Sequence, residues 1–236
     1  AKGREERMLD EALIVAILQI IAIDIILGGD NAIIIALACR NLPKRQKRLG
    51  ILWGTAGAII LRCLLVFFAS TLLTIPSLKL IGGLLLLWIG IKLLADEDDF
   101  DEGTVKQSAS LYDAIRTIII ADFVMSLDNS VAIAAAAKGN MALVIFGLAL
   151  SVPIIIGGSA IILNLMTRFP IIIMLGGALL GWLAGDLIVH DPLLADYVKT
   201  LPEMTSTYAA AGCALMVVVA GRIIASRRTA RASDTE

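Results

Sequence analysis

Apolar stretches long enough to cross a lipid bilayer recur along this chain, and they constrain its fold more than any other feature. A transmembrane helix needs about 20 predominantly apolar residues. Here 58% of the 236 residues are hydrophobic and 17% are charged. We therefore predict an all-α, polytopic membrane protein with seven transmembrane helices. The predicted spans are residues 12–39, 49–73, 78–95, 111–137, 141–166, 170–190 and 207–225.

The first of these spans differs from a cleaved signal peptide. It is too long, and it carries Asp24 and Asp30 inside its apolar run. We expect it to remain in the membrane as a transmembrane helix.

Basic residues predict the orientation, because Lys and Arg concentrate in cytoplasmic connections. One basic cluster follows the first span and another closes the chain. With seven spans, both clusters reach the cytoplasm only if the amino terminus lies outside and the carboxy terminus inside. The clusters are Arg40, Lys44, Arg45, Lys47 and Arg48, and Arg222, Arg227, Arg228 and Arg231.

The second half of the chain repeats the first. The segment IIAIDIILGGDNAIIIALACR aligns with IIIADFVMSLDNSVAIAAAAK at a constant offset of 98, and IGGLLLLWIGIK aligns with LGGALLGWLAGD, which places Trp88 on Trp182. Each unit holds three spans, and an odd number of spans inverts the second copy in the membrane, as in many secondary transporters. The first alignment superposes Asp24 on Asp122, Asp30 on Asp128, Asn31 on Asn129 and Arg40 on Lys138.

The repeat divides the chain into seven parts. An amino-terminal segment (1–11) precedes the first three-helix repeat (12–95), an acidic cytoplasmic loop (96–110) and the second three-helix repeat (111–190). An outer loop (191–206), the seventh helix (207–225) and a cytoplasmic tail (226–236) follow. We interpret the acidic loop as a solvated linker, with a regulatory or ion-attracting role as the alternative.

Four acids lie within the spans. Inversion places Asp24 and Asp122 face to face near the bilayer centre. Asp30 then lies toward the cytoplasm and Asp128 toward the outside, each about 9 Å further along its helix. A charged Asp at a helix centre costs about 2.5–3.5 kcal/mol on insertion scales. The set therefore predicts cation coordination or proton relay. The alternative is structural: the acids pair with Arg62, midway along the second span, or cap helix breaks.

A glycine pair precedes the second acid of the first motif. Gly28 and Gly29 weaken the helix, so Asp30 and Asn31 are predicted to start a new half-helix, which frees carbonyl groups toward an ion. The second motif, SLDNS, lacks these glycines. There we expect a milder irregularity, with freed backbone groups bonded by Ser126 and Ser130.

The ligand types narrow the choice of cation. Carboxylate and amide oxygens suit magnesium, calcium and manganese. Met125 lies at helical spacing from both Asp122 and Asp128 and as a ligand would favour manganese or iron(II), but packing in the core is the preferred interpretation of this residue. His190 is interpreted as a solvated loop residue. The cysteines Cys39, Cys63 and Cys213 are interpreted as helix-packing thiols, because no metal-binding spacing joins them.

Other polar and small residues have simpler interpretations. Lys92 is expected to extend its amine to the cytoplasmic face, and Asp186 to attract cations at the outer mouth. Gly82, Gly83, Gly176 and Gly177 predict close helix contacts. The basic clusters lie at membrane edges without interleaved aromatic residues, so no nucleic-acid partner is predicted.

With GGDN and SLDN at matching places in a 3+3 repeat followed by one more span, the sequence resembles the TerC family of integral membrane proteins, in its YjbE-like bacterial branch. The resemblance covers nearly all of residues 12–225. It implies a multi-pass protein of the bacterial inner membrane that exports divalent metals, chiefly manganese. It also implies metal-handling roles for Asp24, Asp30, Asn31, Asp122, Asp128 and Asn129.

These observations lead to one main hypothesis. The chain is a secondary transporter that works by alternating access, holds the metal between Asp24 and Asp122, and passes it outward from Asp30 to Asp128. The four acids and Arg62 sum to −3 if all are ionised, so the empty site should recruit protons, which predicts proton antiport.

The alternative is a membrane scaffold or metal-stress assembly subunit that binds metal only structurally. An enzyme is not expected, because no nucleophile–base set or organic cofactor motif is present. Membrane lipid is an expected partner, and the sequence leaves homodimerisation open.

Overall fold

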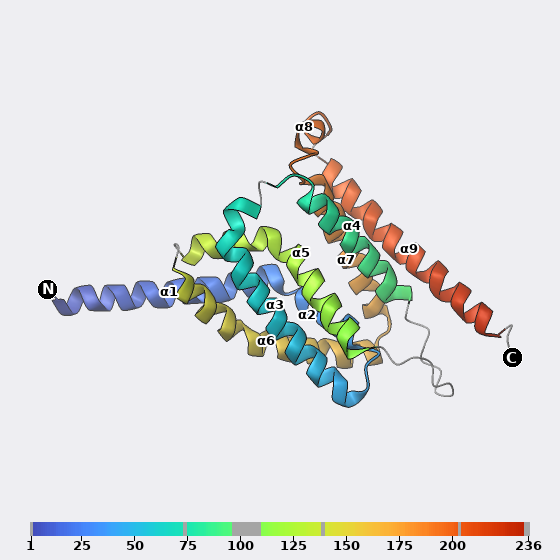
Figure 1. The fold of residues 1–236 in the computed structure, drawn as a ribbon, viewed down its shortest axis with the longest axis horizontal. Helices are drawn as coiled ribbons and strands as arrows, with labels where there is room; N and C mark the ends of the chain where they lie inside the picture. Colours follow the sequence, from blue (N-terminus) through green and yellow to red (C-terminus); the bar gives the residue numbers. More distant parts are fainter. Residues whose placement is uncertain (1, 73–74, 96–109, 138–139, 203, 234–236) are drawn as a thin grey trace.

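The computed structural model describes residues 2–72, 75–95, 110–137, 140–202 and 204–233 (Figure 1), and every regular element in this part of the chain is a helix. The prediction of an all-helical membrane protein is confirmed. Six helices among the described residues are long and apolar enough to cross a membrane, and the bent pair α1 and α2 makes a seventh when the two are counted as one span. The helices are α1 (Lys2–Gly28), α2 (Asn31–Cys39), α3 (Lys44–Leu72), α4 (Leu78–Ala95), α5 (Leu111–Ala137), α6 (Met141–Arg168), α7 (Ile171–Val189), α8 (Ala195–Val198) and α9 (Thr205–Ser233).

The helices form two packed groups. One group contains α1, α2, α3, α5 and α6, and the other contains α4, α7 and α9. Packing follows the sequence repeat, because α3 packs on α5 as α6 packs on α1 and α2. Figure 1 shows that corresponding helices, such as α4 and α7, run in opposite directions. The first two spans of each repeat therefore make one body, and their third spans make the other together with α9.

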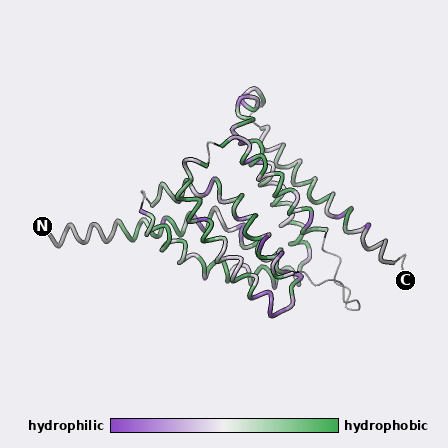
Figure 2. Tube along the Cα trace, in the orientation of Figure 1, coloured by the Kyte–Doolittle hydropathy of each residue, from purple (hydrophilic) through white to green (hydrophobic). Residues whose placement is uncertain are grey.

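Hydrophobic side chains cover the outside of both groups. Figure 2 shows apolar residues along all the long helices and hydrophilic ones gathered at the start of α3. Large side chains such as Trp53, Phe67 and Leu215 are exposed. An exterior of this kind suits contact with lipid acyl chains, because a water-soluble monomer rarely exposes so much apolar surface.

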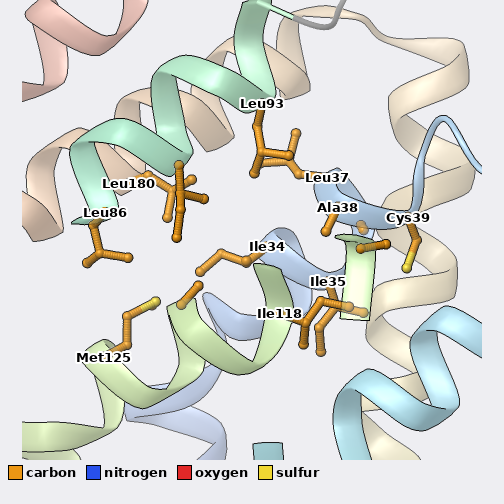
Figure 3. Close-up of a cluster of buried hydrophobic side chains, with 14 of the residues drawn as sticks. Ile34, Ile35, Leu37, Ala38, Cys39, Leu86, Leu93, Ile118, Met125 and Leu180 are labelled. Carbon is orange, nitrogen blue, oxygen red and sulfur yellow. The ribbon is translucent and has the colours of Figure 1, made fainter. Parts of the chain in front are cut away.

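A buried hydrophobic cluster joins the two groups where α2, α4, α5 and α7 meet (Figure 3). Ile34 and Leu37 of α2 lie here beside Leu86 and Leu93 of α4. Met125 belongs to the same cluster and is 9% exposed. The structure thus shows Met125 among apolar side chains, as in the core-packing interpretation.

Glycines let helices approach closely, as predicted for Gly82, Gly83, Gly176 and Gly177, both within the second group and, at Gly82 and Gly176, against α5 and α2 of the first group. A Cβ atom at Gly83 would lie 2.7 Å from the backbone oxygen of Ala184. Two further glycines of α7 do the same against α9, since a Cβ at Gly181 would lie 2.6 Å from the oxygen of Cys213. Gly185 meets the backbone of Ala209 and Ala210 in the same way. Small residues at intervals of four give this close contact.

The second acidic motif is more regular than expected. α5 is helical without interruption from Leu111 to Ala137, so the irregularity predicted at SLDNS is wrong. The Oγ atom of Ser130 donates to the carbonyl of Leu127 at 2.9 Å. A serine can make this bond within an intact helix, and without a glycine pair this copy of the motif continues as one unbroken helix.

Two connections also differ from the sequence expectation. α3 begins at Lys44, so most of the first basic cluster lies in the opening turns of a helix and not in a loop. The short helix α8 lies within the outer loop. The acidic-loop prediction for residues 96–110 falls mostly outside the described part of the chain, as does Lys138.

Candidate functional site

The first span is broken at the glycine pair. α1 ends at Gly28 and α2 begins at Asn31, with a bend of 51° between them. Asp30 stands at the N-cap, where its carbonyl accepts from the amides of Ile33 and Ile34 at 3.0 and 3.2 Å. A Cβ at Gly29 would lie 2.8 Å from the backbone oxygen of Ile25. The close approach explains why the break needs glycine at this position.

A buried guanidinium group joins the two repeats near this break. Arg62 of α3 contacts Asp24 through Nη1 and contacts the Oδ1 atom of Asp122 through Nη2 at 2.5 Å. Its Nε atom donates to the Oγ of Ser126 at 3.0 Å. Ser151 of α6 donates to the other oxygen of Asp24. We call Arg62, Asp24, Asp122, Ser126 and Ser151 the Arg62 cluster.

The Arg62 cluster is closed to solvent. Asp24, Arg62 and Asp122 are 2%, 3% and 5% exposed, and both serines are buried. A buried charge is costly unless it is paired and hydrogen-bonded, and this arrangement meets both requirements. With one cation and two carboxylates, the ionised cluster carries a net charge of −1. The two acids that the repeat superposes therefore meet through one arginine, which belongs to the first repeat.

Gly28 and Ser126 hold equivalent positions in the two repeats, and both face Arg62. Ser126 accepts the Nε hydrogen bond, whereas a Cβ at Gly28 would lie 3.3 Å from Nη1 and 2.9 Å from the Nδ2 atom of Asn31. Gly28 thus leaves room for the guanidinium and for Asn31. Glycine in the first motif leaves space for the Arg62 guanidinium, and serine in the second motif accepts its hydrogen bond.

Polar atoms beside the Arg62 cluster are buried without hydrogen-bond partners. They are the Oδ1 atom of Asp30 and both side-chain polar atoms of Asn31, which is 4% exposed. Such orphaned groups are rare because each one costs free energy. Asn31 and Asp122 also line a small cavity of about 10 Å³, enough for one water-sized ligand. Asp30 interacts electrostatically with Asp122. The three acids therefore belong to one electrostatic environment.

The outermost acid of the predicted ladder has a different partner. Asp128 forms an ion pair with Lys79 of α4 at 2.5 Å, and the two side chains are 47% and 15% exposed. Asn129 beside it is half-buried. Asp128 thus links the two helix groups through an ion pair and stays partly exposed.

The remaining candidate residues lie apart from the Arg62 cluster. Within the described residues, no group of three or more Cys, His, Asp or Glu side chains could hold a metal ion. The ring of His190 is exposed and lies 2.8 Å from the carbonyl of Asp186, and the amine of Lys92 stands 5.4 Å from the ring centroid of Trp88. Cys39, Cys63 and Cys213 are free thiols. Any cation site near the cluster would therefore need amide, hydroxyl or backbone oxygens as well as carboxylates.

Three contributing residues were missed by the sequence interpretation. Ser151 and Lys79 are partners of the predicted acids, but no spacing relates them to those acids along the chain. Asp191 is fully buried and accepts hydrogen bonds from the amides of Ser77, Leu80 and Leu193 at 2.8–3.0 Å. It caps the start of α4 from the end of α7. The turn it holds includes Ser77 at a φ of 69°.

A larger cavity of about 180 Å³ lies at the ends of α2 and α4 and the start of α5. Its charged lining residues are Arg40, Lys92 and Asp113. Arg40 is buried and donates to the carbonyl of Leu93 at 2.6 Å. None of the cavity's lining residues belongs to the Arg62 cluster, so the two features are separate.

Comparison with known proteins gives one family. The model described as the integral membrane protein TerC family matches residues 9–230. The membrane protein YjbE of Bacillus subtilis (strain 168) is 43% identical over 185 residues, covering 78% of this chain and 84% of YjbE. A UPF0053 protein of Buchnera aphidicola is 23% identical over 92% of this chain, and YoaE of Escherichia coli (strain K12) is 28% identical over 52%. The chain spans 44% of the former and 27% of the latter. No solved structure matches.

Proposed function

The chain belongs to the TerC family of integral membrane proteins, and from this premise we propose that it is a secondary transporter that exports divalent metal ions, with manganese as the expected cargo. The observation that carries the proposal is the Arg62 cluster. Two repeat-related carboxylates meet there around one cation inside a helical membrane protein. Intramembrane acids of this kind mark ion pathways, and sites at a repeat interface beside a broken helix are typical of transporters.

The unsatisfied atoms at the helix break support cation binding. Asp30 and Asn31 offer oxygen atoms that have no hydrogen-bond partner, and Asp122 shares a small cavity with Asn31. Oxygen ligands of this type suit hard divalent cations. We propose that Asp24, Asp30, Asn31 and Asp122 form the inner binding site. Asp128 and Asn129 would then act on the outward path, where Asp128 is partly exposed.

Charge balance favours exchange with protons. Asp24, Asp30 and Asp122 together with Arg62 sum to −2 when ionised, which one divalent ion would neutralise. An empty site of this charge is costly within the bilayer, so protons are the natural counter-ions for its return. We therefore propose proton antiport by alternating access. If manganese uptake into vesicles neither moves protons nor responds to an imposed pH gradient, this coupling is wrong.

Manganese and the outward direction come from the family resemblance, and the bacterial inner membrane is the proposed location for the same reason. In this reading the protein has no enzymatic role. The rival proposal is the membrane scaffold with a structural metal site. It predicts metal binding without translocation, and it predicts that deleting residues 96–102 abolishes function.

The deciding experiment is metal flux into proteoliposomes. Manganese, calcium, magnesium and zinc are compared for the wild type and for Asp30→Asn, Asp24→Asn and Asp122→Asn. Asp30→Asn is the most informative variant. Asp30 forms no ion pair with any described residue, so removing its charge should not destabilise the fold by breaking an ion pair. Asp196→Asn is the matched control, since Asp196 is an exposed acid that pairs with the exposed Lys199.

We expect manganese flux in the wild type and in Asp196→Asn, and its loss in the three site variants. Monodisperse gel-filtration profiles for all five proteins show that they are folded. Binding without flux in the wild type would favour the scaffold. Flux that survives all three site substitutions would overturn the proposed site.

A further inference from the structure

Arg62 occupies the position that a divalent cation would take between the two repeat-related carboxylates. Its Nη1 atom contacts Asp24 and its Nη2 atom contacts Asp122. A metal bridging these acids would need the same oxygen atoms and the same space. The guanidinium and the metal therefore cannot both bind the pair, because like charges at contact distance repel strongly in a low-dielectric interior.

We propose that Arg62 is a tethered cation that takes the place of the transported ion in the empty protein and leaves the two carboxylates when the ion binds. The inference rests on the proposed function for the identity of the ion. It assigns Arg62 as a specificity and positioning residue and not merely as a permanent structural counter-ion.

The residues around Arg62 bear on how its guanidinium would move away from the two acids. Arg62 reaches the cluster on a long side chain from α3, and its Nε contact is to Ser126, whose hydroxyl donates in turn to Asp122 at 3.3 Å. Gly28 places no side chain between the guanidinium and Asn31, since its missing Cβ would contact both. Asp30 stands at the N-cap of α2 at the same helix break, and its Oδ1 atom lacks a hydrogen-bond partner. In the proposed exchange the guanidinium leaves the two carboxylates for this one.

The charges remain balanced in this exchange. A divalent ion between Asp24 and Asp122, together with Arg62 beside Asp30, makes the loaded site neutral. With Arg62 removed, the loaded site would keep a net charge of −1. The tethered cation therefore weakens metal binding by competition, and it also lets the ion leave by taking back the acids. Its loss should trap the metal.

The test measures manganese affinity and flux on the same purified, full-length variants. Affinity is obtained from the manganese electron paramagnetic resonance signal, which reports free ion. Arg62→Gln removes the charge and keeps a polar group, and Arg62→Lys keeps the charge with a shorter reach. Ser126→Ala removes the Nε acceptor together with the hydroxyl that donates to Asp122, and it leaves the guanidinium charge in place. Arg168→Gln is the control, because Arg168 lies at the exposed end of α6.

We expect Arg62→Gln to bind manganese more than about tenfold tighter than the wild type, because losing a unit charge at contact distance exceeds the energy of one decade in affinity. Flux should fall in the same variant. Arg62→Lys should return the affinity toward the wild-type value. Ser126→Ala should tighten binding by a smaller factor, and Arg168→Gln should change nothing.

A purely structural Arg62 would behave differently, since its removal would weaken binding or leave it unchanged. If Arg62→Gln and Ser126→Ala are monodisperse and neither binds more tightly while the wild type still transports manganese, the tethered cation is wrong and the proposed function stands. Tighter binding in both variants without flux in the wild type would keep the tethered cation and refute transport. If neither wild type nor variants bind any divalent ion, both proposals fail.

Discussion

Single residues at the broken span determine the geometry around Arg62. Gly28 is one example, because it is packed against both the guanidinium and the amide of Asn31. Arg62 in turn holds two acids that lie far apart in the chain. A change of one methyl group can therefore alter the position of every charged group in the cluster.

The substitution Gly28→Ala should reduce manganese flux roughly tenfold or more, since small displacements of site groups have large effects on rate. The new Cβ would lie 2.9 Å from the Nδ2 atom of Asn31 and force it to move. Flux assays on monodisperse protein provide the measurement. Gly157→Ala is the matched control, because no atom lies within 4 Å of its new Cβ. Equal flux in both variants would contradict the prediction.

The carboxyl group of Asp191 should make the stability of the folded protein depend on pH. Burial raises the pKa of its carboxyl, but hydrogen bonds from the amides of Leu80, Leu193, Ser77 and Lys79 outweigh burial, so the pKa lies below its ordinary value of 3.8. A lowered pKa stabilises the folded state above the unfolded-state pKa, and this stability is lost as pH falls through the folded-state value. Asp191→Asn should lower stability by about 1–2 kcal/mol, like the loss of a helix cap.

Thermal unfolding in detergent between pH 7 and pH 3 measures this effect. The difference between wild type and Asp191→Asn should be largest near neutral pH and should shrink below about pH 4. A constant difference over the whole range would show that Asp191 acts through packing alone.

At this scale the sequence predicted the acids but not their partners. Asp24, Asp122 and Arg62 stood out because charges are rare within apolar spans. Their shared contact depends on how α1, α3, α5 and α6 pack together, and no spacing along one helix carries that information. Ser151 was missed because a serine within a transmembrane helix usually bonds its own backbone, as Ser151 also does with Leu148.

The helices of the second group are held together by close contact between their backbones. α7 and α9 approach so closely that Gly181 and Gly185 meet the backbone of α9. Because lipid provides little hydrophobic driving force between helices, this packing supplies much of their association.

The substitution Gly181→Val should separate α7 from α9 and lower the midpoint of thermal unfolding by several degrees, since overpacking costs about 1–3 kcal/mol. Gly212→Val on α9 is the control, because its new side chain meets open space. Unfolding curves in detergent compare the two. A similar midpoint for both variants would mean that the helices can shift without cost.

Element boundaries followed the sequence closely where composition changes sharply. Residues 78–95 and 111–137 were predicted as spans, and α4 and α5 have these limits. The start of α3 was missed because its first turns are basic, and hydropathy does not distinguish a polar helix end from a loop. The mild irregularity predicted at SLDNS was wrong because, without a glycine pair, the polar residues of this motif fit into an uninterrupted α5.

At the scale of the molecule, the two helix groups meet at the buried cluster of Figure 3 and at the Asp128–Lys79 pair. The repeat, the opposite directions of its copies and the apolar exterior could all be predicted from the sequence. How the helices divide between groups could not, because the third span of each repeat leaves its own unit to pair with its counterpart.

The orientation of the protein in the membrane remains a prediction, and cysteine labelling measures it directly. In a variant lacking Cys39, Cys63 and Cys213, a cysteine in place of Lys199 should react with a membrane-impermeant maleimide from outside the cell. A cysteine in place of Arg45 should react only after permeabilisation. Both positions are exposed, so a difference in labelling reports the side of the membrane. The reverse pattern would invert the topology and make the proposed direction of transport inward.

The origin of Arg62 in the first repeat has a consequence for biogenesis. Spans enter the bilayer in the order of synthesis, so Asp24 meets its base within the same nascent unit. Asp122 arrives later, and the base it contacts is already embedded in the preceding half. We therefore expect insertion of the second half to depend on the first, which would make the direction of translation part of how this membrane protein assembles.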